Sequence, residues 1–281
     1  MKKKVLKIAA LVFAIALIVG VCMFANGLVG NPISKAIATN TAEKHLEENY
    51  ADKDFEIERV FYSFKDGYYH AFIFSPSSID SDFTILIDMW GKVRYDTYED
   101  RVLSGGNTAD RISRDYRETV DKVLDSPAFP YNAHIGYGDF KFYPREHLKE
   151  HSVPEYALIT EDLTLDAFYD VNELGAKHGM LTIYIEDNTI TIERMSKILL
   201  DIKTIFDNAG VKFYMIDCVL EYPKTEEGIR RVERVEVMSF LYADIYEDGM
   251  VERVKASDEA ANAYYDEQDA EKFKEEAKEN Q

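Results

Sequence analysis

Cysteine is scarce in this sequence: the 281 residues include two, Cys22 and Cys218. Cys22 lies in an apolar run near the N-terminus and Cys218 lies in the body of the chain, so no intramolecular disulfide framework is expected. The scarcity argues against a small secreted domain held together by cystines, but it is compatible with a location outside the cytoplasm. Stability must come from a packed apolar core, and hydrophobic residues make up 46% of the chain.

Basic residues are also few. The chain has 33 lysines and arginines against 52 acidic residues, which gives a net charge of −19. Lys2, Lys3, Lys4 and Lys7 all precede the apolar run, so the remainder of the chain is more acidic still. A body of this charge repels phosphate backbones and shows no basic stripe, which argues against nucleic acid as a partner. The surplus of acids is typical of a solvated surface.

Signatures of common catalytic sites are missing. The sequence has no glycine-rich phosphate loop, no G-x-S-x-G elbow and no recognisable Ser/His/Asp set. Two acidic groupings, residues 80–82 and the series Asp162, Asp166 and Asp170, lack the glycine and terminal glutamate of a calcium loop. We interpret the first, Asp80-Ser81-Asp82, as a turn between strands. The second is interpreted as a solvated helix face or as acids at a helix N-terminus.

The apolar run from Ile8 to Ala25 contains no charged residue. A helix of this length, at 1.5 Å per residue, spans roughly 27 Å, which matches a bilayer core. Residues 8–29 are therefore interpreted as a permanent membrane anchor. A cleaved signal peptide is the first alternative, but its apolar region is shorter and ends in a small-x-small site. The best candidate here is Met23-Phe24-Ala25, which has a large residue where a small one is wanted.

Cys22 raises a second alternative, the lipid attachment site of a bacterial lipoprotein. Lipoprotein signals have Gly, Ala or Ser before the cysteine, and this chain has Val21. Apolar residues also follow Cys22, whereas a lipidated cysteine ends the hydrophobic segment. We favour the uncleaved anchor. Because the lysines lie on its N-terminal side, the positive-inside rule predicts a single pass through the cell membrane, a cytoplasmic N-terminus and an extracytoplasmic body.

Two α+β modules are expected after the cytoplasmic stub and anchor, residues 1–30. Apolar residues recur at helical spacing to about Tyr50, and four strand-like segments follow, with turns at Asp66-Gly67 and Gly91. Residues 31–103 are thus predicted to form one helix and a four-stranded antiparallel meander. One face of such a sheet packs on the helix, and the other faces water or a partner. Paired glycines and a helix cap at 103–111 indicate the boundary.

The second module, residues 104–281, is predicted to be α+β with a mixed sheet, because helix crossovers and hairpin connections alternate along it. A helix is expected to end before Pro127, and another to run from about 191 to Gly210. Cys218 is expected to be a buried, inert thiol on a core strand. From Ser257 onward we predict an acidic terminal helix docked through Tyr264 and Phe273, with a free acidic tail as the alternative.

The most specific motif is HLKEH, residues 147–151. Histidines at i and i+4 lie on one helical face, where His147 and His151 can bind one Zn²⁺ while Glu150 polarises a bound water. The spelling H-x-x-E-H is that of the inverzincin metallopeptidases. Pro144 and Pro154 leave little room for a helix, and nothing marks a third ligand. A surface turn is therefore the favoured interpretation, and zinc binding is the alternative.

The strands of the first module are rich in tyrosine. The aromatic residues of this module include Trp90, the single tryptophan, and a set of strand tyrosines: Tyr62, Tyr68, Tyr69, Tyr95 and Tyr98. Such residues can form a stacking platform for glycans or peptides. Aromatic side chains favour strands in any case, so packing in the core and across strands is the competing interpretation.

Long stretches of the sequence resemble a known family. NPISKAIATNTAEKHLEENYADKDFEIERVFYSFKDGYYHAFIFSP follows the lysine-flanked anchor, and DIKTIFDNAGVKFYMIDCVLEYPK and VMSFLYADIYEDGMVERV lie in the second half. Together they resemble the YfjL-like membrane-anchored proteins of Gram-positive bacilli. The resemblance implies separate N- and C-terminal modules and supplies no functional residues, because the family has no established activity. The helix and meander also resemble small modules of PepSY type.

Three functions remain as hypotheses. The leading one is a single-pass protein that presents two modules outside the membrane as a binding or interaction device for an envelope protein or peptide, without a cofactor. The first alternative is a zinc-dependent envelope peptidase that uses Glu150, His147 and His151. The second is a small-ligand sensor, which requires a concave pocket in the C-terminal module. An enzyme is the less favoured class.

Overall fold

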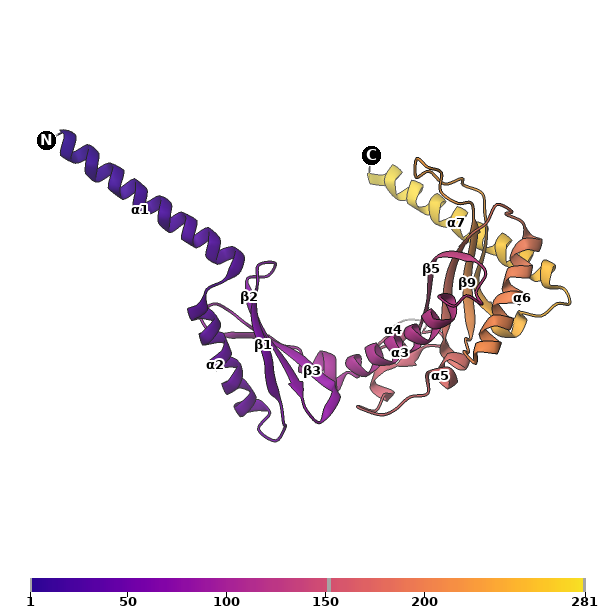
Figure 1. The fold of residues 1–281 in the computed structure, drawn as a ribbon, viewed down its shortest axis with the longest axis horizontal. Helices are drawn as coiled ribbons and strands as arrows, with labels where there is room; N and C mark the ends of the chain where they lie inside the picture. The colour runs from indigo at the N-terminus through magenta and orange to yellow at the C-terminus, as the bar shows by residue number, and fades with distance from the viewer. Residues whose placement is uncertain (1, 151–152, 280–281) are drawn as a thin grey trace. The chain divides into compact units, whose positions relative to one another are not determined.

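The computed structural model describes residues 2–150 and 153–279 (Figure 1). The chain falls into two compact units. The first unit contains Met1–Thr108 and Leu163–Ala167, and the second contains Ala109–Asp162 and Phe168–Gln281. Helices and strands are present in both, with an antiparallel sheet in the first and a mixed sheet in the second, so the predicted α+β class is confirmed.

Helix α1 (Lys2–Val29) begins the first unit. Its described side chains include exposed large apolar residues, among them Leu11 at 61%, Phe13 at 71% and Phe24 at 71%. Within the described part of the chain, no helix combines the length and the apolar character needed to cross a membrane. The side chain of Cys22, on which the lipid-attachment alternative depends, lies outside the described residues.

Helix α2 (Pro32–Asn49) covers one face of a four-stranded antiparallel sheet. The strands follow in the order β1 (Glu56–Ser63), β2 (Tyr68–Ser75), β3 (Ser78–Ile87) and β4 (Val93–Asp96), which confirms the predicted helix and meander. Asn31 starts α2, because its side chain accepts a hydrogen bond from Ser34 N at 2.8 Å and Pro32 fits the first turn. The core under α2 contains Val60, Tyr69, Ala71, Ile73, Phe83, Ile85 and Ile87.

Gly30 joins α1 to α2 in a left-handed conformation, with φ at +68°. A Cβ at this position would lie 2.6 Å from Tyr69 Oη and 2.8 Å from Tyr62 Cβ. Tyr69 Oη accepts from Asn31 N at 2.8 Å and donates to Asn31 O at 3.1 Å, while Tyr62 Oη donates to Gly27 O at 3.1 Å. The junction is therefore held against β1 and β2 by two tyrosines, and only glycine fits it.

A mixed sheet forms the centre of the second unit, in the order β10-β9-β8-β5. Strand β5 (Asn132–Asp139) is antiparallel to β8 (Met180–Glu186), β8 is parallel to β9 (Met215–Glu221), and β10 (Arg234–Leu241) is antiparallel to β9. The parallel pair follows from the crossover through helix α6 (Ile192–Ala209). A short parallel pair, β6 (Phe142–Tyr143) with β7 (Leu158–Ile159), precedes β8.

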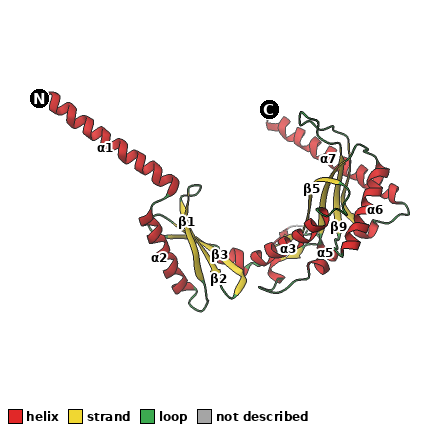
Figure 2. Ribbon diagram, in the orientation of Figure 1, coloured by secondary structure: helices red, strands yellow, loops and turns green. Residues whose placement is uncertain are grey.

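Helices α3 (Gly106–Leu124), α5 (Val171–His178) and α6 lie along this sheet (Figure 2). Helix α3 approaches β5 closely, because a Cβ on Gly138 would lie 2.5 Å from Val120 Cγ2 and one on Gly136 would lie 2.7 Å from Leu124 Cδ1. The remaining elements are short: a π-helical turn (Glu99–Leu103), α4 (His147–Glu150) and 3₁₀ turns at Thr160–Asp162 and Tyr242–Asp244.

Helix α7 (Met250–Glu279) lies beside β10, the edge strand of the sheet. Asp258 Oδ1 accepts from Glu236 N at 2.8 Å, which satisfies an edge N–H of β10. The predicted docking through Tyr264 is wrong, because Tyr264 is 52% exposed and its neighbour Tyr265 donates to Glu236 Oε1 at 2.9 Å. The face of α7 that contacts β10 is therefore the one that carries Tyr265, and not the one that carries Tyr264. The side chain of Phe273 lies outside the described residues.

Candidate binding cavity in the second unit

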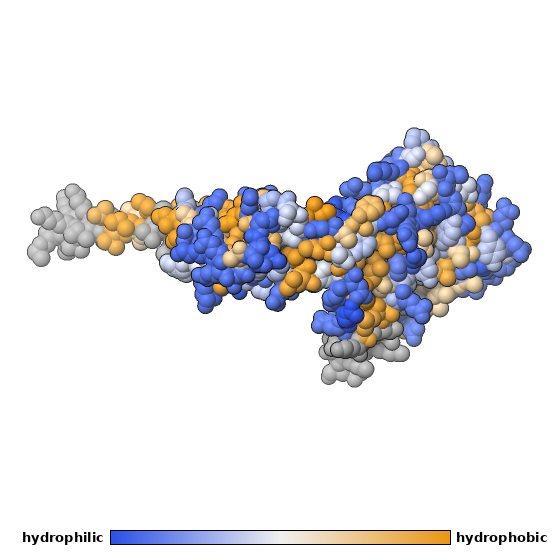
Figure 3. Space-filling view, turned by 90° about the horizontal axis from the view of Figure 1, so that it is seen from below, coloured by the Kyte–Doolittle hydropathy of each residue, from blue (hydrophilic) through white to orange (hydrophobic). Residues whose placement is uncertain are grey.

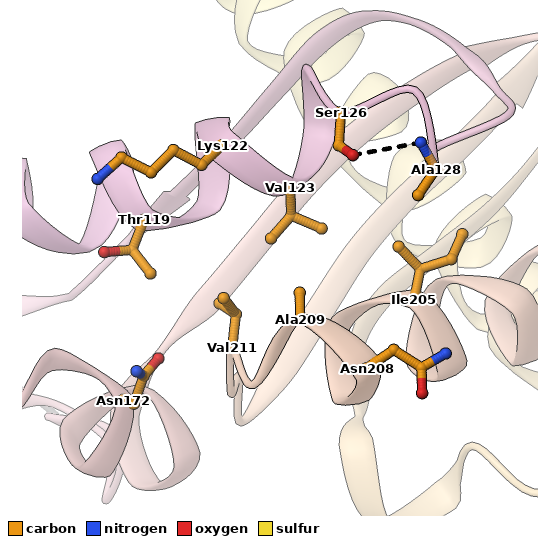
Figure 4. A pocket seen from close by; sticks show the side chains of 10 residues that line it. All are labelled: Thr119, Lys122, Val123, Ser126, Ala128, Asn172, Ile205, Asn208, Ala209 and Val211. Carbon is orange, nitrogen blue, oxygen red and sulfur yellow. Dashed lines mark hydrogen bonds between the residues drawn. The ribbon is translucent and has the colours of Figure 1, made fainter.

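A cavity of about 600 Å³ opens between α3, α5 and the end of α6 (Figure 4). This volume is in the range of small-molecule sites. The lining residues all belong to the second unit: Thr119, Lys122, Val123, Ser126, Ala128, Asn172, Ile205, Asn208, Ala209 and Val211.

The floor of the cavity is apolar because of how α6 ends. Gly210 adopts a left-handed conformation with φ at +71°, and Val211 N donates back to Phe206 O at 3.0 Å. This Schellman-type closure turns the chain under the helix and buries Val211 to 6% exposure. Val123 from α3, at 5% exposure, lies opposite, and Ile205 and Ala209 complete the apolar lining.

Asn172 places an amide in the cavity from the first turn of α5. The N-terminus of α5 is fixed by Asp170, whose Oδ1 accepts from Asn172 N at 2.9 Å and from Glu173 N at 3.2 Å. The side chain of Asn172 points toward the cavity, across from Thr119 (Figure 4). Its Oδ1 is buried and has no hydrogen-bond partner among the described residues.

The neighbouring polar groups are already engaged. Thr119 Oγ1 donates to Asp115 O at 2.8 Å, so its proton is not available to Asn172. Ser126 Oγ accepts from Ala128 N at 3.2 Å within the loop that follows α3. A buried acceptor without a donor costs roughly 1–3 kcal/mol, because it has lost water and gained nothing. A ligand with an N–H or O–H group in this position would recover that cost.

Lys122 is the single charged side chain among the residues that line the cavity. It is exposed at the rim, so the cavity suits neutral ligands and tolerates anionic ones. The lining contains no histidine, cysteine or carboxylate.

The described part of the HLKEH motif forms a single helical turn and does not resemble the long helix of a zinc peptidase. His147 begins α4, a single turn, and its ring lies edge-on to Tyr143 with 6.1 Å between the centroids. The side chain of Glu150 and the whole of His151 lie outside the described residues, so zinc binding stays the alternative hypothesis. In residues 2–150 and 153–279, no cluster of three or more His, Cys, Asp or Glu is arranged to hold a metal ion.

Asp80 and Asp166, one residue from each acidic grouping, meet in the first unit. Asp80 lies within β3 and is 1% exposed, so its assignment to a turn is wrong. Asp166 Oδ1 accepts from Ser78 Oγ at 2.9 Å, Ile79 N at 2.9 Å and Asp80 N at 3.0 Å. Asp166 N and Thr108 Oγ1 donate to Asp80 Oδ2 at 3.1 and 2.9 Å. These bonds satisfy a buried carboxylate that the local sequence could only place in solvent.

Asp166 itself is neither on a solvated helix face nor at a helix N-terminus. Its φ is +60°, a conformation that aspartate tolerates better than most residues. Asp170, by contrast, caps the N-terminus of α5, which agrees with the predicted alternative of an acid at a helix N-terminus. Asp162 lies in a 3₁₀ turn and pairs with Arg145.

The predicted aromatic platform is divided between the two faces of its sheet. Tyr69 is 1% exposed beneath α2, and Tyr98 packs 4.8 Å from Tyr50 between ring centroids, so core packing holds for both. Trp90 is 80% exposed in the turn before β4. The face away from α2 carries a row that crosses all four strands through the pairs Phe61↔His70, His70↔Leu86 and Leu86↔Tyr95.

Cys218 is fully buried on β9, and burial raises the pKa of its thiol to about 12. At neutral pH the thiol is therefore protonated and unreactive, which confirms the expected inert cysteine. The cavity itself had no signal in the sequence. Its lining comes from three separate stretches, residues 119–128, Asn172 and residues 205–211, and Asn172 follows a helix cap like many surface asparagines.

Comparisons with known proteins cover both modules. A family model described as the YfjL-like N-terminal domain matches residues 2–97, and one described as the YfjL-like C-terminal domain matches residues 115–255, which include the whole cavity lining. These matches do not test the likeness to PepSY modules. No curated protein matches.

A solved structure of a DUF5037 family protein from Ruminococcus gnavus is similar over 65% of this chain and 73% of that chain, at 14% identity and a TM-score of 0.20. A likeness at this level supports no argument about fold or function.

Proposed function

The chain belongs to the YfjL-like family, and from this premise we propose that it is a single-pass membrane-anchored protein whose C-terminal module binds a small ligand. The observation that carries the proposal is the buried, unpaired Oδ1 of Asn172 in a cavity with an apolar floor. Native proteins rarely leave a buried acceptor unsatisfied, so each such group calls for a specific partner.

The lining defines the class of ligand. An apolar body of aromatic or aliphatic character would rest on Val123, Ile205 and Val211. One N–H or O–H group would donate to Asn172 Oδ1, and a negative group, if present, would lie near Lys122. Sites with an apolar interior and a few placed polar groups bind in this way. The proposal corresponds to the sensor among the sequence hypotheses.

Matched pairs of fragments test the binding mode. Full-length protein in lipid nanodiscs would be titrated with indole and 1-methylindole, and with phenol and anisole, by ligand-observed NMR. The two members of each pair share the same aromatic ring, and only one of them has an N–H or O–H donor. We expect the donor-bearing member to bind about tenfold more tightly, because each good hydrogen bond to a buried group is worth about 1.5 kcal/mol. Equal affinities within each pair, or no binding by either, would overturn the proposal.

A cavity-filling variant locates the site. Ala209 is exposed at the last turn of α6 and lines the cavity, so Ala209→Trp fills the space without disturbing the core. Thr204→Trp is the matched control, because Thr204 is exposed on the same helix and does not line the cavity. We expect indole binding to be lost in the first variant and kept in the second. Binding that survives Ala209→Trp would place the ligand elsewhere.

The membrane anchor rests on separate support. Residues 8–25 contain no charge, four lysines precede them, and the helix that includes them has 28 residues. Apolar side chains line the described part of α1 in the space-filling view (Figure 3). Exposed apolar surface on this scale is unfavourable in water and favourable in lipid. The lysines then place the N-terminus in the cytoplasm and both modules outside.

Cysteine labelling in intact cells tests the anchor and its direction. In a Cys22→Ser background, Asp52→Cys provides an exposed thiol in the first unit, and Lys3→Cys provides one before the apolar run. The native Cys218 is buried and contributes little signal. We expect a membrane-impermeant maleimide to label residue 52 in intact cells and residue 3 only after lysis. The reverse pattern, or release of the protein by alkaline carbonate, would contradict the anchor.

A second candidate function, binding of an envelope protein or peptide, is favoured by the row of side chains across the first sheet. Phe61 is 40% exposed and Tyr95 is 49% exposed, and Phe61 stacks on Phe72 with 5.3 Å between ring centroids. A photo-crosslinking residue at position 95 should give products with an envelope protein in intact cells. A residue at exposed position 52 serves as the control, and equal products from both positions would remove this candidate.

A further inference from the structure

Four exposed apolar side chains lie on α2 and in the turn between β3 and β4, and we call them the junction patch. They are Ile33 at 75%, Ile37 at 41%, Met89 at 36% and Trp90 at 80% exposure. The outer face of α2 also lines a shallow hollow of about 700 Å³, formed by Pro32, Ile33, Ala36, Ile37, Asn40, Thr41 and Lys44. Exposed apolar surface of this kind is usually an interaction site.

The patch is one surface although its residues come from two segments. A Cβ on Gly91 would lie 2.6 Å from Ile37 Cγ2, so the backbone of the turn rests directly on α2. Thr41 Oγ1 donates to Gly91 O at 3.2 Å and ties the same turn to the helix. Trp90 directly precedes Gly91 in this turn.

Hydrogen bonds to the carboxylate of Asp88 hold the turn that carries Trp90. Asp88 is 7% exposed, and its Oδ1 accepts from Trp90 N and Lys92 N, each at 2.9 Å. Its Oδ2 accepts from Arg94 Nε at 3.0 Å. The only carboxylate in the turn is thus turned inward and bonded, while the indole is held outward. A rigid turn that presents a tryptophan to solvent needs a partner to account for it.

The charge of the patch differs from that of the chain. The hollow along α2 has one charged lining residue, Lys44, in a protein of net charge −19. Lys92, which follows Gly91 in the turn, is exposed. Exposed apolar side chains with lysines among them suit a lipid surface, where tryptophan occupies the headgroup level and lysine reaches phosphate.

We propose that the junction patch rests in the headgroup region of the membrane that α1 crosses. The inference rests on the proposed anchor and deepens it. Ile33 follows Val29, the last residue of α1, by four residues, so it lies within roughly 14 Å of the end of that helix even in an extended chain. The first module is then held on the bilayer by α1, Ile33, Ile37 and Trp90 together, and it does not swing on a tether.

Trp90 reports this contact directly, because it is the single tryptophan of the chain. Full-length protein would be reconstituted in vesicles of phosphatidylcholine and phosphatidylglycerol in equal parts, with or without brominated acyl chains. We expect Trp90 emission to be blue-shifted, quenched by the brominated lipid and protected from iodide. The double variant Ile33→Ser, Ile37→Ser should lower the bromine quenching by about half, because the remaining apolar contact is weaker.

Ile79→Ser is the matched control, since Ile79 is 69% exposed in the same unit and lies outside the patch. If iodide quenches Trp90 emission while the protein resists carbonate extraction, the proposed contact of the patch with the membrane is wrong and the anchor stands. Loss of the protein from the vesicles would overturn the anchor itself. A blue shift that grows with protein concentration without bromine quenching would show a second copy on the patch and would also overturn the inference.

Discussion

At the scale of single residues, a substitution of Asn172 tests most directly whether the cavity is a ligand-binding site. Replacing Asn172 with leucine, of similar size, removes the unpaired acceptor. We expect Asn172→Leu to raise the free energy of unfolding of the ligand-free protein by about 1 kcal/mol, because the desolvation penalty of Oδ1 disappears. The same change should abolish the preference for indole over 1-methylindole. Chemical denaturation and NMR titration measure the two effects.

Asn208→Leu is the control for this prediction, because Asn208 lines the same cavity but is exposed. It should leave the stability within a few tenths of a kcal/mol and keep the indole preference. If Asn172→Leu destabilises the protein instead, its amide is a structural group and the argument for a ligand donor fails.

Residue types alone gave the right environment for some positions and the wrong one for others. Cys218 was predictable, since it has apolar neighbours on an apolar strand and is fully buried. Asp80 was not, because its burial depends on donors from Thr108 and Asp166, far away in the sequence. Asn172 was not predictable either, since the hollow beside it exists only after α3, α5 and α6 have packed.

At the scale of elements, the turn before β4 should respond to acid. Hydrogen bonds to Asp88, first from Lys92 N–H and also from Trp90 N–H and Arg94, hold the pKa of its carboxyl below the usual value. The folded pKa lies below the unfolded one, so the stabilisation is present above the unfolded pKa and is lost as pH falls below about 4. Trp90 emission should therefore change over this range.

Asp88→Asn is the comparison for the acid response. It should weaken the turn at neutral pH and flatten the change in Trp90 emission below about pH 4, because an amide does not ionise. The fluorescence of both proteins between pH 7 and pH 2 measures the difference. An identical acid transition in the two would assign the response to other carboxyl groups.

The contact between α3 and β5 gives a second prediction at this scale. Gly138→Ala would place a Cβ 2.5 Å from Val120 Cγ2 and 2.8 Å from Tyr116 Cε1, and overpacking of this kind costs about 1–3 kcal/mol. Val120→Ala in the same chain should recover part of the loss, so the two changes are coupled. Additive losses in urea denaturation of the single and double variants would contradict the proposed contact.

The positions of helices and strands in the sequence were more predictable than the faces through which they pack. The helices ending near Pro127 and at Gly210 follow from turn residues and from local periodicity. The face of α7 did not follow, because Tyr264 and Tyr265 are adjacent and both fit an apolar stripe. The tertiary bonds of Asp258 and Tyr265 to Glu236 select one of them.

At the scale of the whole molecule, the two units are interleaved along the chain. The sequence indicates a boundary at 103–111, yet Leu163–Ala167 belongs to the first unit. No composition signal marks this return, because it depends on hydrogen bonds from the start of β3 to one carboxylate, that of Asp166. Stability of the first unit therefore depends on a residue from the second half of the sequence.

Each unit carries its own reporter, which makes this dependence measurable. Trp90 lies in the first unit, and Cys218 is buried in the second. In a Cys22→Ser background, Asp166→Ala should lower the urea midpoint followed by Trp90 emission and leave the midpoint followed by Cys218 labelling unchanged. The expected loss is about 2 kcal/mol, since three donors lose a charged acceptor near the surface. Asp170→Ala, which removes the cap of α5 in the second unit, should do the reverse. If both reporters shift together in either variant, the units unfold as one body, and the interleaved segment joins them into a single cooperative structure.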